Sequence, residues 1–156
     1  MTRVVLLVTL AVLAAGCSWS NGRGVPAAER SATLELRQVQ TAFGYPEGSI
    51  GVLRVRDTDG RPVGPVLLAS REARQLGPGT FESDFPPLDL PPGDYVVELW
   101  QHPCSGVCAS DEEIVEANDP PGDQLDRCTA RVTLAAGETR RITATWAPGK
   151  GCAAFE

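Results

Sequence analysis

The side chains most able to do chemistry are four cysteines in the last third of the chain: Cys104, Cys108, Cys128 and Cys152. Four thiols can bind zinc or form two disulfides, and an exported chain favours disulfides. We therefore predict two disulfides and no metal. Of the three connectivities we favour Cys104–Cys128 with Cys108–Cys152, because the expected strands bring all four to one end of the domain. The alternative joins Cys104 to Cys108 and Cys128 to Cys152.

An acidic segment lies between the second and third of these cysteines, with no basic residue before Arg127. Its carboxylates belong to Asp111, Glu112, Glu113, Glu116, Asp119, Asp123 and Asp126. Calcium takes six to eight oxygen ligands, so the loop 111–126 is a candidate calcium site, although its spacing matches no EF-hand. The other interpretations are a solvated acidic loop and a docking surface for a cationic protein or peptide.

Residues that could catalyse a reaction are few. His102 is the single histidine, and Ser105 and Ser110 lie in no Gly-x-Ser-x-Gly context. The stretch Gly149-Lys150-Gly151 lacks the spacing of a phosphate-binding loop. We predict no catalytic residue, no cofactor and no enzymatic activity.

Two tryptophans, Trp100 and Trp146, could stack on a sugar ring. Both lie at strand ends with apolar neighbours, which favours core packing. Carbohydrate binding and calcium binding are the alternative functions.

The N-terminus indicates export. Arg3 precedes a hydrophobic run of twelve residues at 4–15, too short for a membrane-spanning helix of about 20 residues. The sequence Ala14-Ala15-Gly16-Cys17 resembles a bacterial lipobox, although Ala14 replaces the usual leucine. The resemblance implies cleavage before Cys17 and acylation of that residue, which would hold the protein on the outer side of the cell membrane.

This cleavage would divide the chain into a signal peptide (1–16), a flexible tether rich in Gly, Ser, Pro and Ala (17–30) and one domain (31–156). Without Arg3 the chain has 13 basic residues (14 minus 1) against 20 acidic ones, a formal charge of −7. An acidic chain without a basic cluster is a poor nucleic-acid binder. We expect a membrane contact through the lipid on Cys17 and a protein partner in the cell envelope.

Alternating apolar and polar residues predict strands over four segments: 33–39, 51–57, 130–134 and 139–146. The β-branched and aromatic residues of 94–100 predict a fifth strand there. Turn signals separate them, including Asp59-Gly60, Pro92-Gly93 and Gly137. The pattern predicts an all-β fold, a single sandwich of seven to eight strands with a disulfide-braced loop at one end. A short helix is expected near residues 70–76, and the alternative is a strand through residues 66–72.

Two stretches extend this pattern. GVLRVRDTDGRPVGPV (51–66) and the turn Leu90-Pro91-Pro92-Gly93-Asp94-Tyr95 resemble carboxypeptidase-regulatory-like and collagen-adhesin B-type domains. The resemblance implies a transthyretin-like or Ig-like sandwich in which Gly93 allows a tight turn and Tyr95 begins an inward-facing strand. An isopeptide bond is not expected, because the single lysine, Lys150, follows the last strand. Residues 31–49 have no clear place in this pattern.

Overall fold

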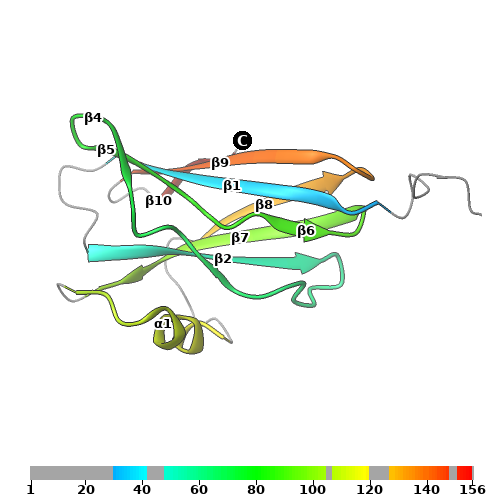
Figure 1. The fold of residues 1–156 in the computed structure, drawn as a ribbon, viewed down its shortest axis with the longest axis horizontal. Coiled ribbons are helices and arrows are strands. Elements are labelled where there is room, and N and C mark those ends of the chain that lie inside the picture. The colour runs from blue at the N-terminus through cyan, green and yellow to red at the C-terminus, as the bar shows by residue number, and fades with distance from the viewer. Residues whose placement is uncertain (1–29, 42–47, 105–106, 120–126, 148–150, 156) are drawn as a thin grey trace, which may run out of the picture.

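The computed structural model describes residues 30–41, 48–104, 107–119, 127–147 and 151–155. Cys17, Ser105, Asp123, Asp126 and Lys150 lie outside these ranges, so the lipid attachment and the 1–16 and 17–30 segments stay predictions. The described residues form two β-sheets and one short helix, which confirms the all-β prediction (Figure 1). No helix in them is long and apolar enough to cross a membrane.

The described residues form ten strands, six in sheet A and four in sheet B. Sheet A has the order β10 (Gly151–Phe155), β9 (Thr139–Ala147), β1 (Ala32–Thr41), β5 (Thr80–Asp84) and β4 (Arg74–Gly77), and β6 (Leu88–Leu90) also pairs with β1. Sheet B has the order β3 (Leu67–Leu68), β2 (Ser49–Asp57), β7 (Gly93–Pro103) and β8 (Cys128–Leu134). All five predicted strands are confirmed, and each extends beyond the prediction at one or both ends. The additional strands β3, β4, β5, β6 and β10 have two to five residues each.

The segment 31–49, unplaced from the sequence, contains a central strand. β1 pairs in parallel with β9, from Thr33–Thr139 to Gln40–Trp146, and antiparallel with β5 and β6 on its other side. Its alternate residues Ala32, Leu34 and Leu36 are buried, because they point at sheet B.

The main core lies between the sheets. Sheet A contributes Leu34, Leu36 and Ile142, and sheet B contributes residues such as Leu53 and Leu99. Each alternates with a residue on the outer face, as a strand period of two requires. Tyr95 is also buried here, and its hydroxyl donates to the Pro91 carbonyl at 2.7 Å.

Two local predictions meet different outcomes. Residues 70–76 form no helix; the chain crosses there from sheet B to sheet A and enters β4 at Arg74. The left-handed turn glycines include Gly60 (φ 82°) and Gly137 (φ 73°), as their turn signals predicted. Gly93 is the first residue of β7 and is not among these left-handed glycines.

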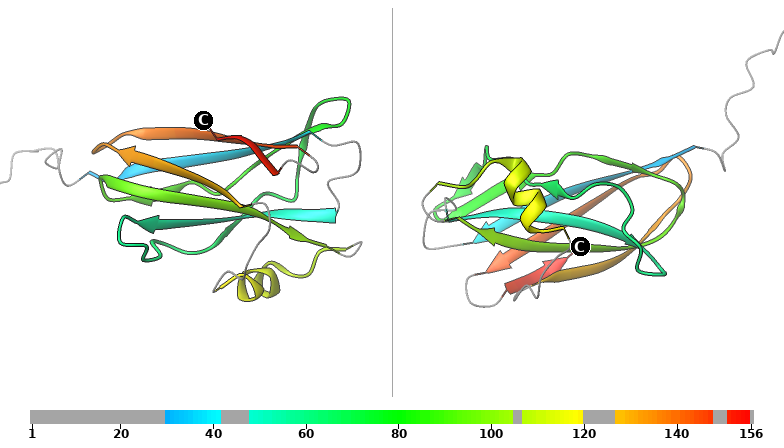
Figure 2. Two further views of the ribbon diagram at one scale, coloured as in Figure 1. Left: turned by 180° about the vertical axis from the view of Figure 1, so that it is seen from behind. Right: turned by 90° about the horizontal axis from the view of Figure 1, so that it is seen from below.

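The helix α1 (Asp111–Ala117) lies on the face of sheet B that points away from sheet A (Figures 1 and 2). That face carries Ile50, Val52 and Trp100, which pack with Ile114 of α1 into a second buried cluster. Exposed apolar side chains on a two-sheet domain need a cover, and α1 supplies it.

Candidate functional site

The disulfides join Cys104 to Cys108 and Cys128 to Cys152. The favoured pairing of Cys104 with Cys128 and Cys108 with Cys152 is therefore wrong, and the alternative is correct. Cys128 pairs across the sheet with Leu99 and faces the main core, whereas Cys104 packs with the outer cluster. The two thiols lie on opposite faces of sheet B and cannot meet.

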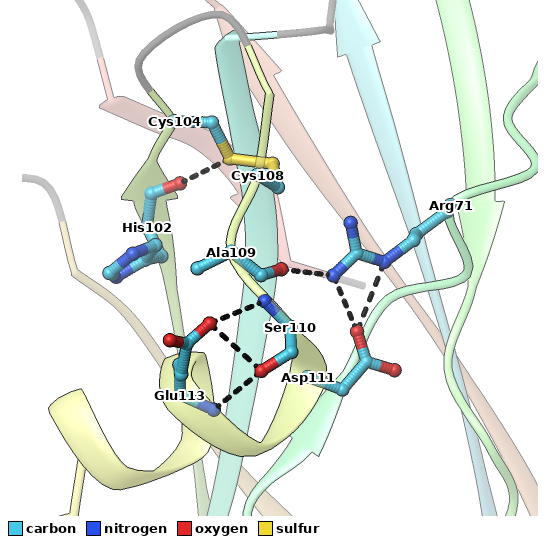
Figure 3. Close-up of polar contacts among 8 residues, drawn as sticks. All are labelled: Arg71, His102, Cys104, Cys108, Ala109, Ser110, Asp111 and Glu113. Carbon is cyan, nitrogen blue, oxygen red and sulfur yellow. Dashed lines mark hydrogen bonds and ion pairs between the residues drawn. A yellow bond between two sulfur atoms is a disulfide. The ribbon is translucent and has the colours of Figure 1, made fainter.

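The Cys104–Cys108 bridge begins the segment 104–119, which we call the braced segment. Residues 111–117 of the predicted acidic loop are helical, because Ser110 and Glu113 form a capping box at the start of α1 (Figure 3). The backbone N–H of Ser110 donates to Glu113 Oε2 at 2.9 Å, and the N–H of Glu113 donates to Ser110 Oγ. The backbone and then the hydroxyl of Ser110 lower the pKa of the Glu113 carboxyl by stabilising its charged form.

Arg71 ties the start of the helix to the connection between the sheets (Figure 3). Its guanidinium donates to the Ala109 carbonyl at 2.6 Å and twice to Asp111 Oδ1, at 2.6 and 3.0 Å. These contacts join residues 38 and 40 positions apart in the sequence. The pair is exposed, so its contribution to stability is small, about 0–1 kcal/mol, but it orients the segment.

Asn118 holds the other end of the helix and is completely buried. Its Oδ1 accepts a hydrogen bond from Trp100 Nε1 at 2.7 Å. Its Nδ2 donates to the Ile114 carbonyl at 2.7 Å and to His102 Nδ1 at 3.0 Å. One amide therefore connects α1 to two side chains of β7.

A buried charge adds a further contact. Arg54 of β2 is 4% exposed, and its guanidinium forms an ion pair with Asp119, directly after Asn118. Beside it, Arg56 and Arg127 both pair with Glu98, and the Arg127 guanidinium lies 5.4 Å from the centroid of the Trp100 ring. Trp100 and Trp146 are both buried, so the sequence prediction of core packing is confirmed.

Three of the five described carboxylates of the acidic segment are thus used internally: Asp111, Glu113 and Asp119. Glu112 and Glu116 are exposed, and neither carboxylate makes a hydrogen bond or ion pair in the described part of the chain. No three His, Cys, Asp or Glu side chains there are grouped to hold a metal ion. Calcium binding that uses Asp123 and Asp126 stays a prediction.

The residues considered for catalysis have other contacts. Ser110 caps α1, and His102 accepts a hydrogen bond from Asn118 through Nδ1. Neither forms part of a nucleophile–base pair in the described residues. The absence of enzymatic activity stays a prediction.

A cleft of about 280 Å³ opens between the sheets, at the end of the domain where β7 ends and β2 begins. We call it the pole cleft. Its polar lining residues are Gln38, Gln40, Ser49, Ser70, Arg71 and Ser83, and Val107 and Cys108 of the braced segment form part of its rim. Gln40 Nε2 donates to Gln101 Oε1 at 3.1 Å, and Gln101 Nε2 donates to Gln38 Oε1 at 3.0 Å.

Sequence reasoning missed most of these residues, although signals existed for two. Ser110-x-x-Glu113 before Ile114 is a legible capping box. The alternation Leu34, Leu36, Gln38 places a glutamine on an inward face, which marks an unusual buried amide. Nothing in the local sequence pairs Arg71 with Asp111, or Arg54 with Asp119.

Comparisons with known proteins add little. No protein-family model matches the chain, and no curated protein matches it. Among solved structures, the chain is similar to part of a leucine-rich repeat protein from Bacteroides thetaiotaomicron, with 14% identity and a TM-score of 0.40. The match covers 74% of this chain, which spans 12% of the length of that protein.

Proposed function

We propose that this chain is a non-enzymatic, lipid-anchored protein of the cell envelope that binds a cationic protein partner through the braced segment. We assign its sandwich to the transthyretin-like or Ig-like class, with the turn 90–95 and the strand pair β2–β7 as support. The observation that carries the function is that the braced segment is fixed at its described residues 104 and 108–119 while the carboxylates of Glu112 and Glu116 stay unused.

The bracing goes beyond what covering an apolar patch requires. A disulfide and the Arg71 contacts hold the start of the segment, and buried Asn118 with Asp119 holds its end. Fixing a surface before binding lowers the conformational entropy lost when a partner docks. Such a surface is suited to specific recognition.

The two unused carboxylates carry a local cost. Glu112 and Glu116 are four residues apart, so they lie on the same side of α1 and repel each other. Glu116 also lies in the last helical turn, where the helix dipole disfavours a negative charge, and no basic residue is present there. A cationic partner would relieve both effects.

The anchor and the location rest on the N-terminal sequence. The resemblance of residues 14–17 to a lipobox supports acylation of Cys17. The two disulfides fit an oxidising compartment. Labelling cells with a palmitate analogue should mark the full chain, and Cys17→Ser should lose the label and leave the membrane fraction.

The docking surface can be tested with a photoreactive amino acid at the exposed position 107 of the full chain in its own envelope. Irradiation should give a discrete crosslinked adduct that Glu112→Lys/Glu116→Lys, with the probe at the same position, abolishes. A matched charge change, Asp59→Lys/Asp94→Lys, lies at the opposite end of β2 and β7 and should leave that adduct intact. Equal loss in both variants would reject a specific acidic docking surface.

A further inference from the structure

The pole cleft contains side-chain hydrogen-bonding groups that have no partner among the described residues. Gln38 Oε1 and Gln40 Nε2 are occupied by Gln101. Gln38 Nε2, Gln40 Oε1 and the hydroxyls of Ser49 and Ser83 make no hydrogen bond to any described residue. Four unused polar groups from β1, β2 and β5 therefore line one cleft.

Gln38 is the most unusual of these residues. It is 3% exposed, on the inward face of a central strand where an apolar side chain would be expected. Its amide lies against Gly51 of β2, and a Cβ at position 51 would lie 2.2 Å from Gln38 Oε1. The close approach of a glycine backbone is what leaves room for this amide. The Nε2 atom of Gln38 is not itself buried, so its unused N–H groups are open to the cleft and can donate to a bound group.

The charge of the cleft identifies the kind of ligand. Among the described residues that line the cleft, Arg71 alone is charged, and its ion pair with Asp111 neutralises that charge. The lining contains no carboxylate, so a cation would find no opposite charge. An anion would find the Arg71 charge already neutralised and the Gln40 carbonyl oxygen unfavourable. A neutral ligand fits best.

The size and the polar pattern narrow the class further. About 280 Å³ is just below the range of about 300–1,000 Å³ for drug-sized ligands. The unused groups include a pure donor, a pure acceptor and two hydroxyls, and the hydroxyl groups of a sugar can complement all of them. Ile50, Ala69 and Ala73 supply apolar contact for ring carbons.

We propose that the pole cleft binds a single neutral sugar ring, through Gln38, Gln40, Ser49 and Ser83. The unused donor and acceptor belong to the side chains of Gln38 and Gln40, which both bond to Gln101. An extended peptide would instead need the free backbone groups of a strand edge. This site is separate from the carboxylates Glu112 and Glu116, and the proposal does not depend on the proposed function.

The test is a titration of the purified full chain with glucose, galactose, mannose and N-acetylglucosamine, followed by amide chemical shifts. At least one sugar should shift the signals of Gln38 and Ser83 at millimolar concentration. Ser83→Ala and Gln38→Leu should each weaken binding by about tenfold, since each removes ligand hydrogen bonds. Gln75→Ala, on the exposed edge strand β4, should leave the affinity unchanged.

Ser83→Ala is the decisive variant if Gln38→Leu fails to fold, because it removes a single oxygen atom. Glu112→Lys/Glu116→Lys should bind the sugar normally, which separates this site from the docking surface. The proposal is overturned if none of the four sugars binds, or if Ser83→Ala binds as well as Gln75→Ala. Shifts of the same signals by a short neutral peptide, and by no sugar, would also overturn it.

Discussion

The indole nitrogen of Trp100 and the side-chain oxygen of Asn118 share a 2.7 Å hydrogen bond in which both side chains are fully buried. Trp100 belongs to β7 in sheet B, and Asn118 ends a helix that lies outside that sheet. The bond therefore joins the sandwich to the braced segment without exposure to water. It couples the position of α1 to the packing of a core tryptophan.

Removing this amide should loosen the braced segment. Asn118→Leu leaves the buried indole N–H without an acceptor, at a cost of about 1–3 kcal/mol, and also removes the bonds to Ile114 and His102. Urea unfolding followed by tryptophan fluorescence should show a lower midpoint. Asn118→Asp keeps the acceptor for Trp100 and should retain the environment of that indole better. An unchanged midpoint in Asn118→Leu would show that the bond contributes nothing.

Tryptic digestion without reduction should establish the disulfide pairing. No Arg or Lys lies between Arg74 and Arg127, so Cys104 and Cys108 share the peptide 75–127. Cys128 falls in the peptide 128–131 and Cys152 in 151–156. We expect mass spectrometry to find these two short peptides linked to each other and not to 75–127. A species that joins all three would contradict this pairing, because both of the other two connectivities produce it.

The two bridges should also differ in their effect on stability. The sequence separation is 24 residues for Cys128–Cys152 and 4 for Cys104–Cys108. In the chain-entropy model these loops correspond to about 3.5 and about 2 kcal/mol. Chemical unfolding should therefore show a larger loss for Cys128→Ser/Cys152→Ser than for Cys104→Ser/Cys108→Ser. The reverse order would mean that the braced segment stabilises the whole domain.

Tyr95 should make the domain sensitive to alkali. Burial, and then the charge of Asp57, raise the pKa of the Tyr95 hydroxyl above its ordinary value of 10.0. The stabilisation by the neutral phenol is thus fully present below pH 10 and is lost as the pH rises through the folded-state pKa. Tyr95→Phe should lose about 1 kcal/mol at neutral pH, with the bond to Pro91. Its unfolding free energy should then fall less steeply in alkali than that of the unmodified chain.

The long strands were predicted well because four of them alternate apolar and polar residues over part of their length, and β7 is rich in β-branched and aromatic residues. The same alternation could have corrected the disulfides, since it puts Cys104 on the outer face of β7 and Leu99, the partner of Cys128, on the inner face. The short strands carry too few residues for a period. The ion pairs Arg71–Asp111 and Arg54–Asp119 span 40 and 65 positions, and local patterns contain no information about such contacts.

At low pH, α1 should unfold locally before the sandwich does. The pKa of the Glu113 carboxyl is lowered by its hydrogen bonds to Ser110, so its stabilisation is present above the ordinary value of 4.5. It is lost as the pH falls through the folded-state pKa. Amide hydrogen exchange at Ile114 and Val115 should therefore rise in acid while exchange in β7 stays slow. Glu113→Ala, which removes the acceptor for Ser110, should show the faster helix exchange already at neutral pH, and equal exchange in both chains would contradict the role of the capping box.

Arg54 and Asp119 should respond unequally to substitution, because their burial differs. The Arg54 side chain is 5% exposed and that of Asp119 is 59% exposed. Asp119→Ala leaves a buried guanidinium without its partner, whereas Arg54→Met removes the charge and keeps apolar contacts on the sheet. Chemical unfolding should show the larger loss for Asp119→Ala, and the double variant should recover part of it. A larger loss for Arg54→Met would mean that packing of the arginine stem, and not its charge, determines stability at this point.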